Sequence, residues 1–398
     1  MSGGLRRVVA IGALSTAIDA GGFLLLREVA GWALVPADAA ALVSAALASF
    51  WLHRMTVAPG DPYERWVDRP AAFARIAAIA GVVDIAVVVG LAHLVDPTTA
   101  VTLLAVKVSA LIVAGVVRLA GERRLLFRVV RAEQDQRVER AAPPGEVRFS
   151  VVVPAYRERD HIGAAVVALR AALEEVSADG GLEIVIIDDG SGDGTAAAAR
   201  DAGADLVLEQ PENRGKGAAV RRGALASHGR AVAFIDADLA YSPDQLLRLL
   251  AEVEDGWDVV VGSRRHEDTT TLVRAGRLRE VGGRAINLLT QAVLLGQYRD
   301  TQCGMKAFRS DVARLLFGRS RVDGFAFDVE LFHLAERYRL SLTEVPVSVA
   351  NSTRSTVRVA RDALHLVRDL FRIRRWAKQG RYDEGVAAFP ADRELPNH

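Results

Sequence analysis

Four apolar stretches dominate the first third of the chain. They run over residues 8–26, 39–52, 76–95 and 98–117. About 20 apolar residues in a helix are enough to cross the hydrocarbon core of a bilayer. Three stretches reach that length, and the second does so only if its helix begins near Val35 and includes Asp38. We therefore expect four transmembrane helices in a domain over residues 1–128, in preference to a soluble bundle or a cleaved signal peptide.

Arginine is distributed unevenly around these stretches. Arg6 and Arg7 precede the first stretch, four arginines lie between the second and the third, and four more follow the last. The other two connections hold one arginine, Arg27. Because Lys and Arg are retained on the cytoplasmic side of membranes, we expect a multi-pass protein of the cell (plasma) membrane. Both termini, and everything after residue 120, would then be cytoplasmic.

Three charged residues fall inside the apolar stretches, namely Asp19, Asp84 and Lys107. A charge within the bilayer core is costly and usually faces protein or water, so we expect Asp84 and Lys107 to pair. The pair fits either a lipid-headgroup path or a simple helix-packing contact. Asp19 and Asp84 are 65 residues apart, as are Val-Ser-Ala triplets at 43–45 and 108–110. Either duplicated helical hairpins or a chance match explains this spacing.

Several of these features occur together in one known family. Arg6 and Arg7 precede the first helix, Asp19 lies within it, and Phe50-Trp51-Leu52-His53-Arg54 closes the second. On these residues the region over roughly 5–128 resembles the GtrA-like membrane family. Members of that family are proposed to help polyprenyl-linked sugars reach the other leaflet. The resemblance implies a membrane domain that handles such lipids.

The chain changes character after residue 128. Residues 129–147 are charged and end in Ala-Ala-Pro-Pro-Gly, which is typical of a linker. Short β-branched runs then alternate with helical patterns; the runs cover residues 149–153, 182–187, 206–209 and 231–235. Such alternation predicts an α/β domain on a mostly parallel sheet with helices on both faces. Functional sites in such sheets lie beyond the carboxyl ends of the strands.

Composition narrows the classes of function. Hydrophobic residues make up 51% of the 398 residues and charged residues 25%, which excludes a disordered or fibrous chain. With 50 basic and 49 acidic residues the net charge is +1, which argues against a nucleic-acid partner. The single cysteine, Cys303, rules out a disulfide framework and a cysteine-based metal site.

Two acidic motifs fall at predicted strand ends. Asp188-Asp189-Gly190-Ser191 either offers carboxylates to a nucleobase or ribose, or forms a plain turn with a helix cap from Asp193 or Thr195. Asp236 and Asp238 lie on one side of a strand. They offer hard oxygen ligands to Mg²⁺ or Mn²⁺, unless they form a solvated strand end.

A glycine-rich motif, Asn213-Arg214-Gly215-Lys216-Gly217, lies between the two acidic motifs. It lacks the spacing of a P-loop, and nothing else suggests an ATPase. We expect a turn that the glycines permit, with Lys216 near phosphates.

Taken in order, these motifs resemble those of the inverting family 2 glycosyltransferases, which have the GT-A fold. The resemblance covers about residues 148–350 and rests on three runs, at 151–158, 188–191 and 236–238. Three further runs resemble the dolichyl- and polyprenyl-phosphate glucosyltransferase branch. These are Gly262-Ser263-Arg264, residues 299–306 with Thr-Gln-Cys-Gly-Met-Lys, and residues 324–330.

The resemblance implies a nucleotide side of the site. The residues that match the family's nucleoside pocket are Pro154, Ala155, Tyr156, Glu158 and Asp189. Asp236 and Asp238 match the acidic motif that holds the nucleotide and a divalent metal, with Asp238 in the reacting centre. Ala240 stands where mannosyl relatives often have a metal-coordinating Gln, so water would replace that ligand.

The resemblance also implies an acceptor side. Arg264 and Arg279 match arginines that meet the acceptor phosphate. Asp328 is expected in the reacting centre, and sugar- or acceptor-side roles fall on Gln302, Lys306 and Glu330. Cys303 is expected to be a packing residue.

The expected function is transfer of a hexose, glucose from UDP-glucose, to a polyprenyl phosphate at the cytoplasmic face. An acceptor phosphate is mostly a dianion near pH 7, so no strong general base is required. Three alternatives stay open. They are transfer of mannose from GDP-mannose, a non-catalytic carrier that only binds nucleotide sugar, and, more weakly, a processive polysaccharide synthase.

The C-terminal region is basic and amphipathic over residues 351–380. It is either a helix on an anionic membrane surface or a helix packed on the catalytic domain. Residues 381–398 are expected to form a polar, flexible tail. The sequence leaves the oligomeric state open, and a homo-oligomer is compatible with it.

Overall fold

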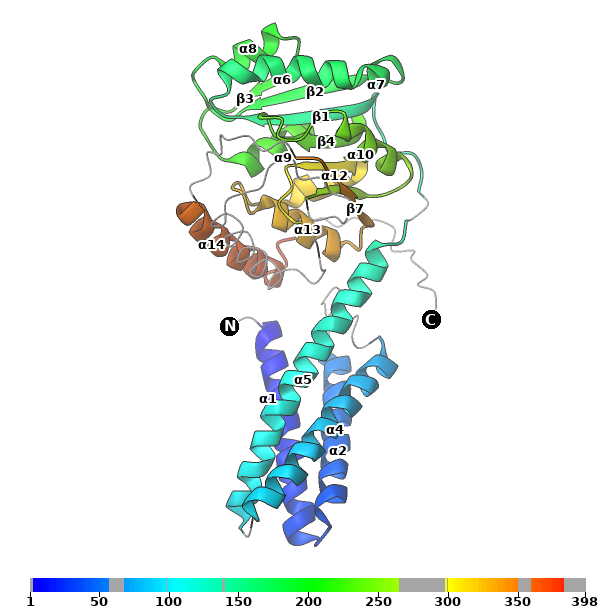
Figure 1. Ribbon diagram of the computed structural model, residues 1–398, viewed down its shortest axis with the longest axis vertical. Coiled ribbons are helices and arrows are strands. Elements are labelled where there is room, and N and C mark those ends of the chain that lie inside the picture. The colour runs from blue at the N-terminus through cyan, green and yellow to red at the C-terminus, as the bar shows by residue number, and fades with distance from the viewer. Residues whose placement is uncertain are drawn as a thin grey trace. The chain divides into compact units, whose positions relative to one another are not determined.

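The chain folds into two compact units, Met1–Val129 and Val130–His398, which we term the helical unit and the α/β unit (Figure 1). The computed structural model describes residues 3–56, 68–97, 99–137, 140–264, 298, 300–349 and 359–382. Arg279, which was expected at the acceptor phosphate, lies outside the described residues. So does most of the expected tail.

Long helices make up the described part of the helical unit. They are α1 (Gly3–Leu24), continued by the π-helical turn η1 (Leu25–Val29), then α2 (Leu34–Thr56), α4 (Pro70–Val95) and α5 (Ala100–Gln134). Four spans are long and apolar enough to cross a membrane; they are Ala10–Val29, Leu34–Thr56, Pro70–Val95 and Ala100–Glu122. The second span includes Val35 and Asp38, as its length required. The protein is therefore an integral, multi-pass membrane protein.

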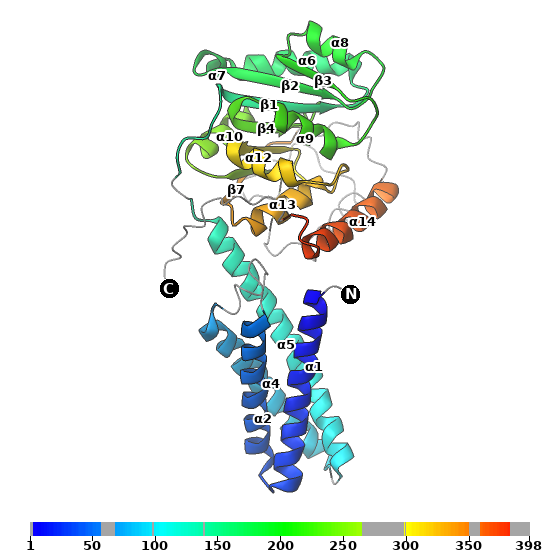
Figure 2. The ribbon, with the colours of Figure 1, turned by 180° about the vertical axis from the view of Figure 1, so that it is seen from behind.

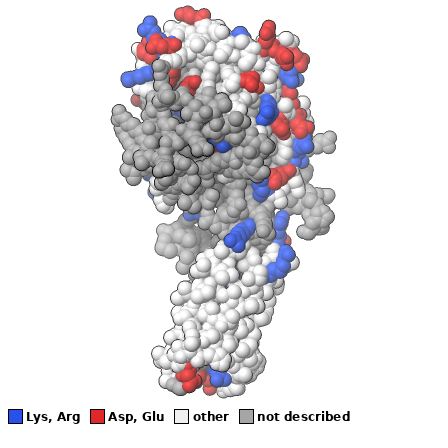
Figure 3. Space-filling model, viewed as in Figure 1, with Lys and Arg blue, Asp and Glu red and all other residues white. Residues whose placement is uncertain are grey.

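The helical unit turns its apolar side chains outward. Between 17% and 28% of the most apolar window of each span is buried, and Val82 and Ile112 are among the exposed large hydrophobic residues. The buried side of α2 is a row of small residues, Ala37, Ala41 and Ala45, which lets helix backbones approach closely. On the face shown in Figure 3, the described residues between the two ends of this unit carry no Lys, Arg, Asp or Glu. Such a surface is suited to lipid.

A seven-stranded mixed sheet forms the centre of the α/β unit. Its strands are β1 (Val147–Ala155), β2 (Leu182–Asp188), β3 (Leu206–Glu209), β4 (Gly229–Ile235), β5 (Val259–Ser263), β6 (Met305–Arg309) and β7 (Leu342–Pro346). The order is β3-β2-β1-β4-β6-β5-β7, and its first four strands are labelled in Figures 1 and 2. Only β6 is antiparallel to its neighbours β4 and β5. The mostly parallel α/β fold that the sequence predicts is confirmed.

Successive strand residues face opposite sides of the sheet, which divides the core into two layers. On one side, Val151 and Val153 pack with helices α6 (Arg159–Ala172), α8 (Thr195–Asp201) and α10 (Gln245–Glu254). On the other side, Val152 and Phe234 pack with α9 (Lys216–Ala226), α12 (Ser310–Arg319) and α13 (Phe327–Arg337). A short helix, α7 (Glu174–Ala178), follows α6.

The last described helix, α14 (Val359–Lys378), packs against the α/β unit through part of one face. Leu370 and Ile373 are buried in the same core layer as α13, whereas Phe371 is 70% exposed. Tyr382 is fully buried, and its hydroxyl donates to the Glu330 carboxylate at 2.6 Å. The ordered chain therefore extends into the region expected to be a flexible tail.

Candidate functional site

The polar motifs meet at one edge of the sheet because their strands are neighbours. β1 pairs with β2, with Ala155 opposite Asp188, and with β4, with Val152 opposite Phe234. The carboxyl ends of these strands, and the residues that follow them, therefore lie together. β6 starts at the same edge, where Met305 is opposite Ile235. This edge is where a parallel sheet is expected to bind a ligand.

Asp189 organises the loop that follows β3. Its Oδ1 accepts hydrogen bonds from the Gln210 side chain at 2.8 Å and the Arg214 backbone at 2.9 Å, and its Oδ2 accepts one from the Gly215 backbone at 2.8 Å. Burial raises the pKa of Asp189 despite the opposing backbone hydrogen bonds. The carboxylate expected in the nucleoside pocket is thus engaged with its own chain in this structure.

The glycines of the 213–217 motif are required by a close approach to residues 322–323. Gly215 has φ +106°, and a Cβ there would lie 2.7 Å from the Asp323 carbonyl oxygen. A Cβ on Gly217 would lie 2.6 Å from the Val322 carbonyl oxygen. These positions exclude larger residues because backbone atoms cannot move aside. The turn places Lys216 at the first position of α9.

Two lysine–carboxylate pairs lie close to the Phe234 ring. Lys216 Nζ is 2.5 Å from Asp236 Oδ1, and Lys306 Nζ is 2.6 Å from Asp328 Oδ1. The two ammonium groups are 5.9 Å and 5.3 Å from the centre of the Phe234 ring. The structure thus brings together four of the charged residues that the sequence singled out.

The electrostatics of the two pairs follow from their burial. Burial disfavours the charged form of Lys216, but the carboxylates of Asp236 and Asp328 outweigh it, so its pKa is raised. Burial raises the pKa of Asp328, against the attraction of Lys306 and Lys216. The side chain of Lys306 is 1% exposed and that of Asp236 is 33% exposed. The Lys306–Asp328 pair is therefore internal, whereas the Lys216–Asp236 pair opens to solvent.

Asp236 and Asp238 were expected to hold a divalent cation. Asp238 is exposed, and its Oδ1 accepts a hydrogen bond from the Ala240 backbone at 3.1 Å. The Asp236 carboxyl lies directly against Gly304, where any Cβ would overlap it. Among the described residues, no group of three or more His, Cys, Asp or Glu side chains could hold a metal ion. Two carboxylates at a solvent-open strand end still suit a hard cation whose other ligands are substrate oxygens and water.

Arg264 and Asp300 form a bidentate ion pair. Nε and Nη2 of Arg264 donate to the two carboxylate oxygens at 2.6 Å and 2.8 Å. Burial disfavours charge on both groups, but the pair lowers the pKa of Asp300 and raises that of Arg264. The Arg264 side chain remains 45% exposed, so its outer edge is available to an anion. Asp300 was not singled out from the sequence.

The other expected nucleoside-pocket residues lie around the end of β1. Tyr156 is 41% exposed, and the Glu158 backbone N–H donates to Thr195 Oγ1 at 3.0 Å. Asp193 accepts the Thr195 backbone hydrogen bond at 3.0 Å, as the turn interpretation predicts. Pro154 is half-buried, and the Ala155 side chain is buried in the core.

Three residues near the acceptor side have structural partners. Glu330 is fully buried and accepts hydrogen bonds from the backbone of Arg321 and Val322 and from Tyr382. The Gln302 backbone donates to Asp300 at 3.2 Å. Cys303 is fully buried, which fits the packing role expected for it, and burial raises its pKa to about 11.

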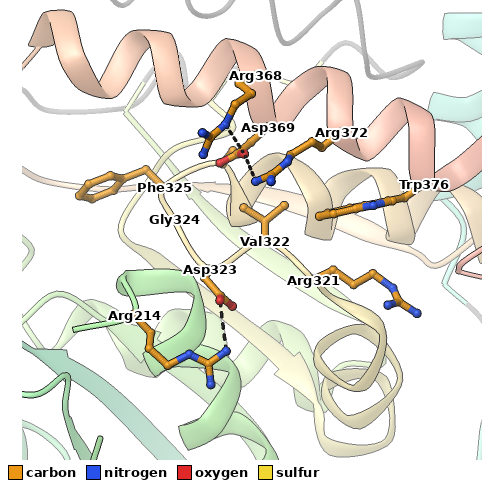
Figure 4. Close-up of a pocket in the computed structure, with 11 residues that line it drawn as sticks. Arg214, Arg321, Val322, Asp323, Gly324, Phe325, Arg368, Asp369, Arg372 and Trp376 are labelled. Carbon is orange, nitrogen blue, oxygen red and sulfur yellow. Dashed lines mark hydrogen bonds and ion pairs between the residues drawn. The ribbon is translucent and has the colours of Figure 1, made fainter. Parts of the chain in front are cut away.

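A basic pocket that the sequence analysis did not predict adjoins the glycine turn. Its cavity of about 360 Å³ lies between α14, the 321–326 segment and Arg214 (Figure 4). Arg214 pairs with Asp323 at 3.2 Å and Arg372 with Asp369 at 3.2 Å. The lining residues are Arg214, Arg321, Val322, Asp323, Gly324, Phe325, Ala326, Arg368, Asp369, Arg372 and Trp376. Four arginines against two aspartates leave the lining cationic.

Comparison with known families identifies both units. The family model for glycosyl transferase family 2 matches residues 150–317, and that for the GtrA/DPMS transmembrane domain matches residues 7–134. The chain belongs to glycosyltransferase family 2, with a GtrA/DPMS transmembrane domain at its N-terminal side, and it is a glycosyltransferase. Both resemblances seen in the sequence are thereby confirmed.

Individual relatives agree with this assignment. Dolichyl-phosphate beta-glucosyltransferase of Drosophila melanogaster is 35% identical over 242 residues, covering 57% of this chain and 74% of the relative. The enzyme of the same name from Dictyostelium discoideum is 31% identical, covering 60% and 77%. A solved structure of glucosyl-3-phosphoglycerate synthase from Mycobacterium tuberculosis is 22% identical with a TM-score of 0.43, covering 62% of this chain and 83% of that chain.

Proposed function

We propose that this glycosyltransferase moves glucose from UDP-glucose to a polyprenyl phosphate at the cytoplasmic face of the cell membrane. The observation that carries the proposal is the solvent-open pair Asp236–Asp238 beside Lys216, in a chain with four membrane-length helices. The relatives are dolichyl-phosphate beta-glucosyltransferases, and this supports the choice of glucose as the sugar and of a lipid phosphate as the acceptor.

Asp236 and Asp238 are the residues that would hold Mg²⁺ or Mn²⁺ together with the diphosphate of the donor. When bound, such a cation offsets the negative charge that develops on the departing nucleotide. Lys216 adds a second positive charge at the same strand end, because its raised pKa keeps it protonated. Asp328 holds Lys306 in place behind the site.

On the acceptor side the chain must bring two anions together. The acceptor oxygen attacks the anomeric carbon and the nucleotide leaves from the opposite face, which inverts the configuration. A phosphate acceptor supplies its own nucleophilic oxygen, so the protein's work is placement and charge neutralisation. We propose that the arginines of the basic pocket beside the glycine turn hold the acceptor phosphate together with Arg264 and Arg279, which match the family's acceptor-phosphate arginines.

The function is tested by offering purified protein labelled UDP-glucose or GDP-mannose together with polyprenyl phosphate and metal, then identifying the lipid product. We expect glucosyl lipid from the wild type and none from Asp238→Ala, which should fold normally because Asp238 is exposed. Mannosyl lipid alone would overturn the choice of sugar. Nucleotide-sugar binding without any transfer would instead support a carrier.

The acceptor pocket is tested separately with Arg372→Gln. Loss of a charge-assisted contact to a phosphate costs about 1.5–3 kcal/mol, so we expect KM for polyprenyl phosphate to rise at least tenfold with little change in KM for UDP-glucose. Arg375→Gln is the matched control, because Arg375 is exposed on the same helix and does not line the pocket. Equal KM values for both variants would remove the pocket from the acceptor path.

A further inference from the structure

Each long helix of the helical unit contributes one charged residue to a single buried cluster. Lys107 of α5 donates to Asp38 Oδ1 of α2 and to Asp84 Oδ2 of α4, both at 2.6 Å. Its Nζ is also 3.1 Å from Asp19 Oδ1 of α1. The side chains of Lys107, Asp38 and Asp84 are 0% exposed and that of Asp19 is 3% exposed. The pairing of Asp84 with Lys107 expected from the sequence is confirmed, and Asp38 is an additional partner.

The cluster is isolated from other charges on its helices. The nearest other titratable residue on any of the four chain segments is Arg27, eight residues from Asp19 and about 12 Å along the helix axis. Arg75 and His93 are each nine residues from Asp84, and Arg118 is eleven residues from Lys107. The other contact recorded for Lys107 in the described residues is the Phe23 ring, 5.7 Å away. No second cation on these helices balances the three acids.

With every group ionised, the cluster would carry a net charge of −2 in the middle of a lipid-facing bundle. Burying an uncompensated ion is energetically costly, and a buried carboxyl group avoids this cost by taking up a proton. Lys107 compensates one of the three carboxylates. Two negative charges remain without a partner, so the packed helices favour protonated carboxyl groups.

The hydrogen bonds of the cluster also indicate bound protons. Within the described residues, the second oxygens of Asp38 and Asp84, Oδ2 and Oδ1, are buried and have no hydrogen-bond partner. Both residues are fully buried. A proton on such an oxygen makes it a hydrogen-bond donor among carboxylate oxygens that can otherwise only accept hydrogen bonds. It also leaves the contacts of the other oxygen with Lys107 unchanged.

We propose that the cluster formed by Asp19, Asp38, Asp84 and Lys107 is an intramembrane proton-binding site. With the four helices packed as they are in this structure, Lys107 is charged and two of the three carboxyl groups carry a proton. Each uptake converts a carboxylate into a carboxylic acid and adds one positive charge. This inference does not depend on the proposed transferase substrates.

The direct test is infrared difference spectroscopy of the purified full-length protein in lipid nanodiscs. A protonated carboxyl group gives a C=O band that shifts in D₂O and disappears when the group ionises. We expect such a band at pH 7 in the spectrum of the wild type minus that of Asp38→Asn/Asp84→Asn. Subtracting the variant cancels the bands of carboxyl groups elsewhere in the protein. Asp201→Asn, at an exposed position, is the matched control and should cancel to a flat spectrum.

A second measurement covers variants that fold poorly. Asp84→Asn reproduces the shape of a protonated carboxyl group, so its thermal unfolding temperature at pH 7 should stay within a few degrees of the wild type. Lys107→Met leaves three acids without a cation, and its unfolding temperature should fall and recover as the pH is lowered. A missing C=O band in the wild type would overturn the proposal. So would an unfolding temperature of the wild type that depends on Na⁺ concentration and not on pH.

Discussion

Replacing Lys216 by Met tests the charge arrangement at the edge of the sheet. Lys216 is held by the glycine turn at the start of α9, 2.5 Å from Asp236, with 18% of its side chain exposed. In this structure its ammonium group therefore contacts a carboxylate oxygen that a bound divalent cation would also need as a ligand. In the proposed complex with the donor, the same group would be free to contact the diphosphate. The substitution removes both interactions and keeps an unbranched side chain of similar length.

The size of the effect follows from the geometry. A hydrogen bond to a charged group contributes about 1.5–3 kcal/mol, and the 33% exposure of Asp236 places this pair at the lower end. About 1.4 kcal/mol corresponds to a tenfold change in a rate or binding constant. We therefore expect kcat/KM for the nucleotide sugar to fall about tenfold. The metal concentration for half-maximal activity should also fall, because Asp236 has lost a competing cation.

The assay is the initial rate of glycosyl transfer to polyprenyl phosphate, measured across a titration of Mn²⁺ at fixed donor and then across donor at saturating Mn²⁺. Lys216→Arg is the control, since it keeps the charge and should retain most of the wild-type metal requirement. The diagnostic result is a fall in both quantities, because it means that transfer is slower although the metal is bound more tightly. If Lys216→Met leaves both the metal requirement and kcat/KM at the wild-type values, Lys216 is a packing residue and the reasoning is refuted.

Two further predictions concern packing and pH. Gly304→Ala should reduce transfer activity at least tenfold without loss of fold, because a Cβ there overlaps the Asp236 carboxyl. Gly318→Ala is the control, because a Cβ there meets nothing within 4 Å, and it should leave transfer activity unchanged in the same assay. Burial and the nearby arginines lower the pKa of His333 to about 4, so the folded state binds fewer protons than the unfolded state below its ordinary pKa of about 6.5. The α/β unit should accordingly lose stability as the pH falls from about 6.5 to about 4. If the unfolding temperature of a His333→Gln variant fell by the same amount over this pH range, the prediction would be contradicted.

The sequence by itself determined the two-part organisation and the position of the main motifs. Membrane-spanning helices and alternating strands are local patterns, because the length of an apolar run and the period of its polar residues depend on neighbours in the chain. The second span is an example: its length required it to begin near Val35, and the helix begins at Leu34. The acidic motifs could be placed in the same way, since they directly follow apolar runs.

Apart from the pairing of Asp84 with Lys107, only the tertiary structure decided which side chains are partners. Asp38 joins Lys107 across 69 residues, and Arg264 is held by Asp300 across 36 residues. Asp189 accepts hydrogen bonds from the glycine turn, and that turn needs its glycines because the carbonyl groups of residues 322–323 lie against it. The basic pocket combines Arg214 with segments more than a hundred residues away. Such contacts depend on how strands and helices pack, and the free energy that selects them comes from the whole core, so no local pattern in the sequence records them.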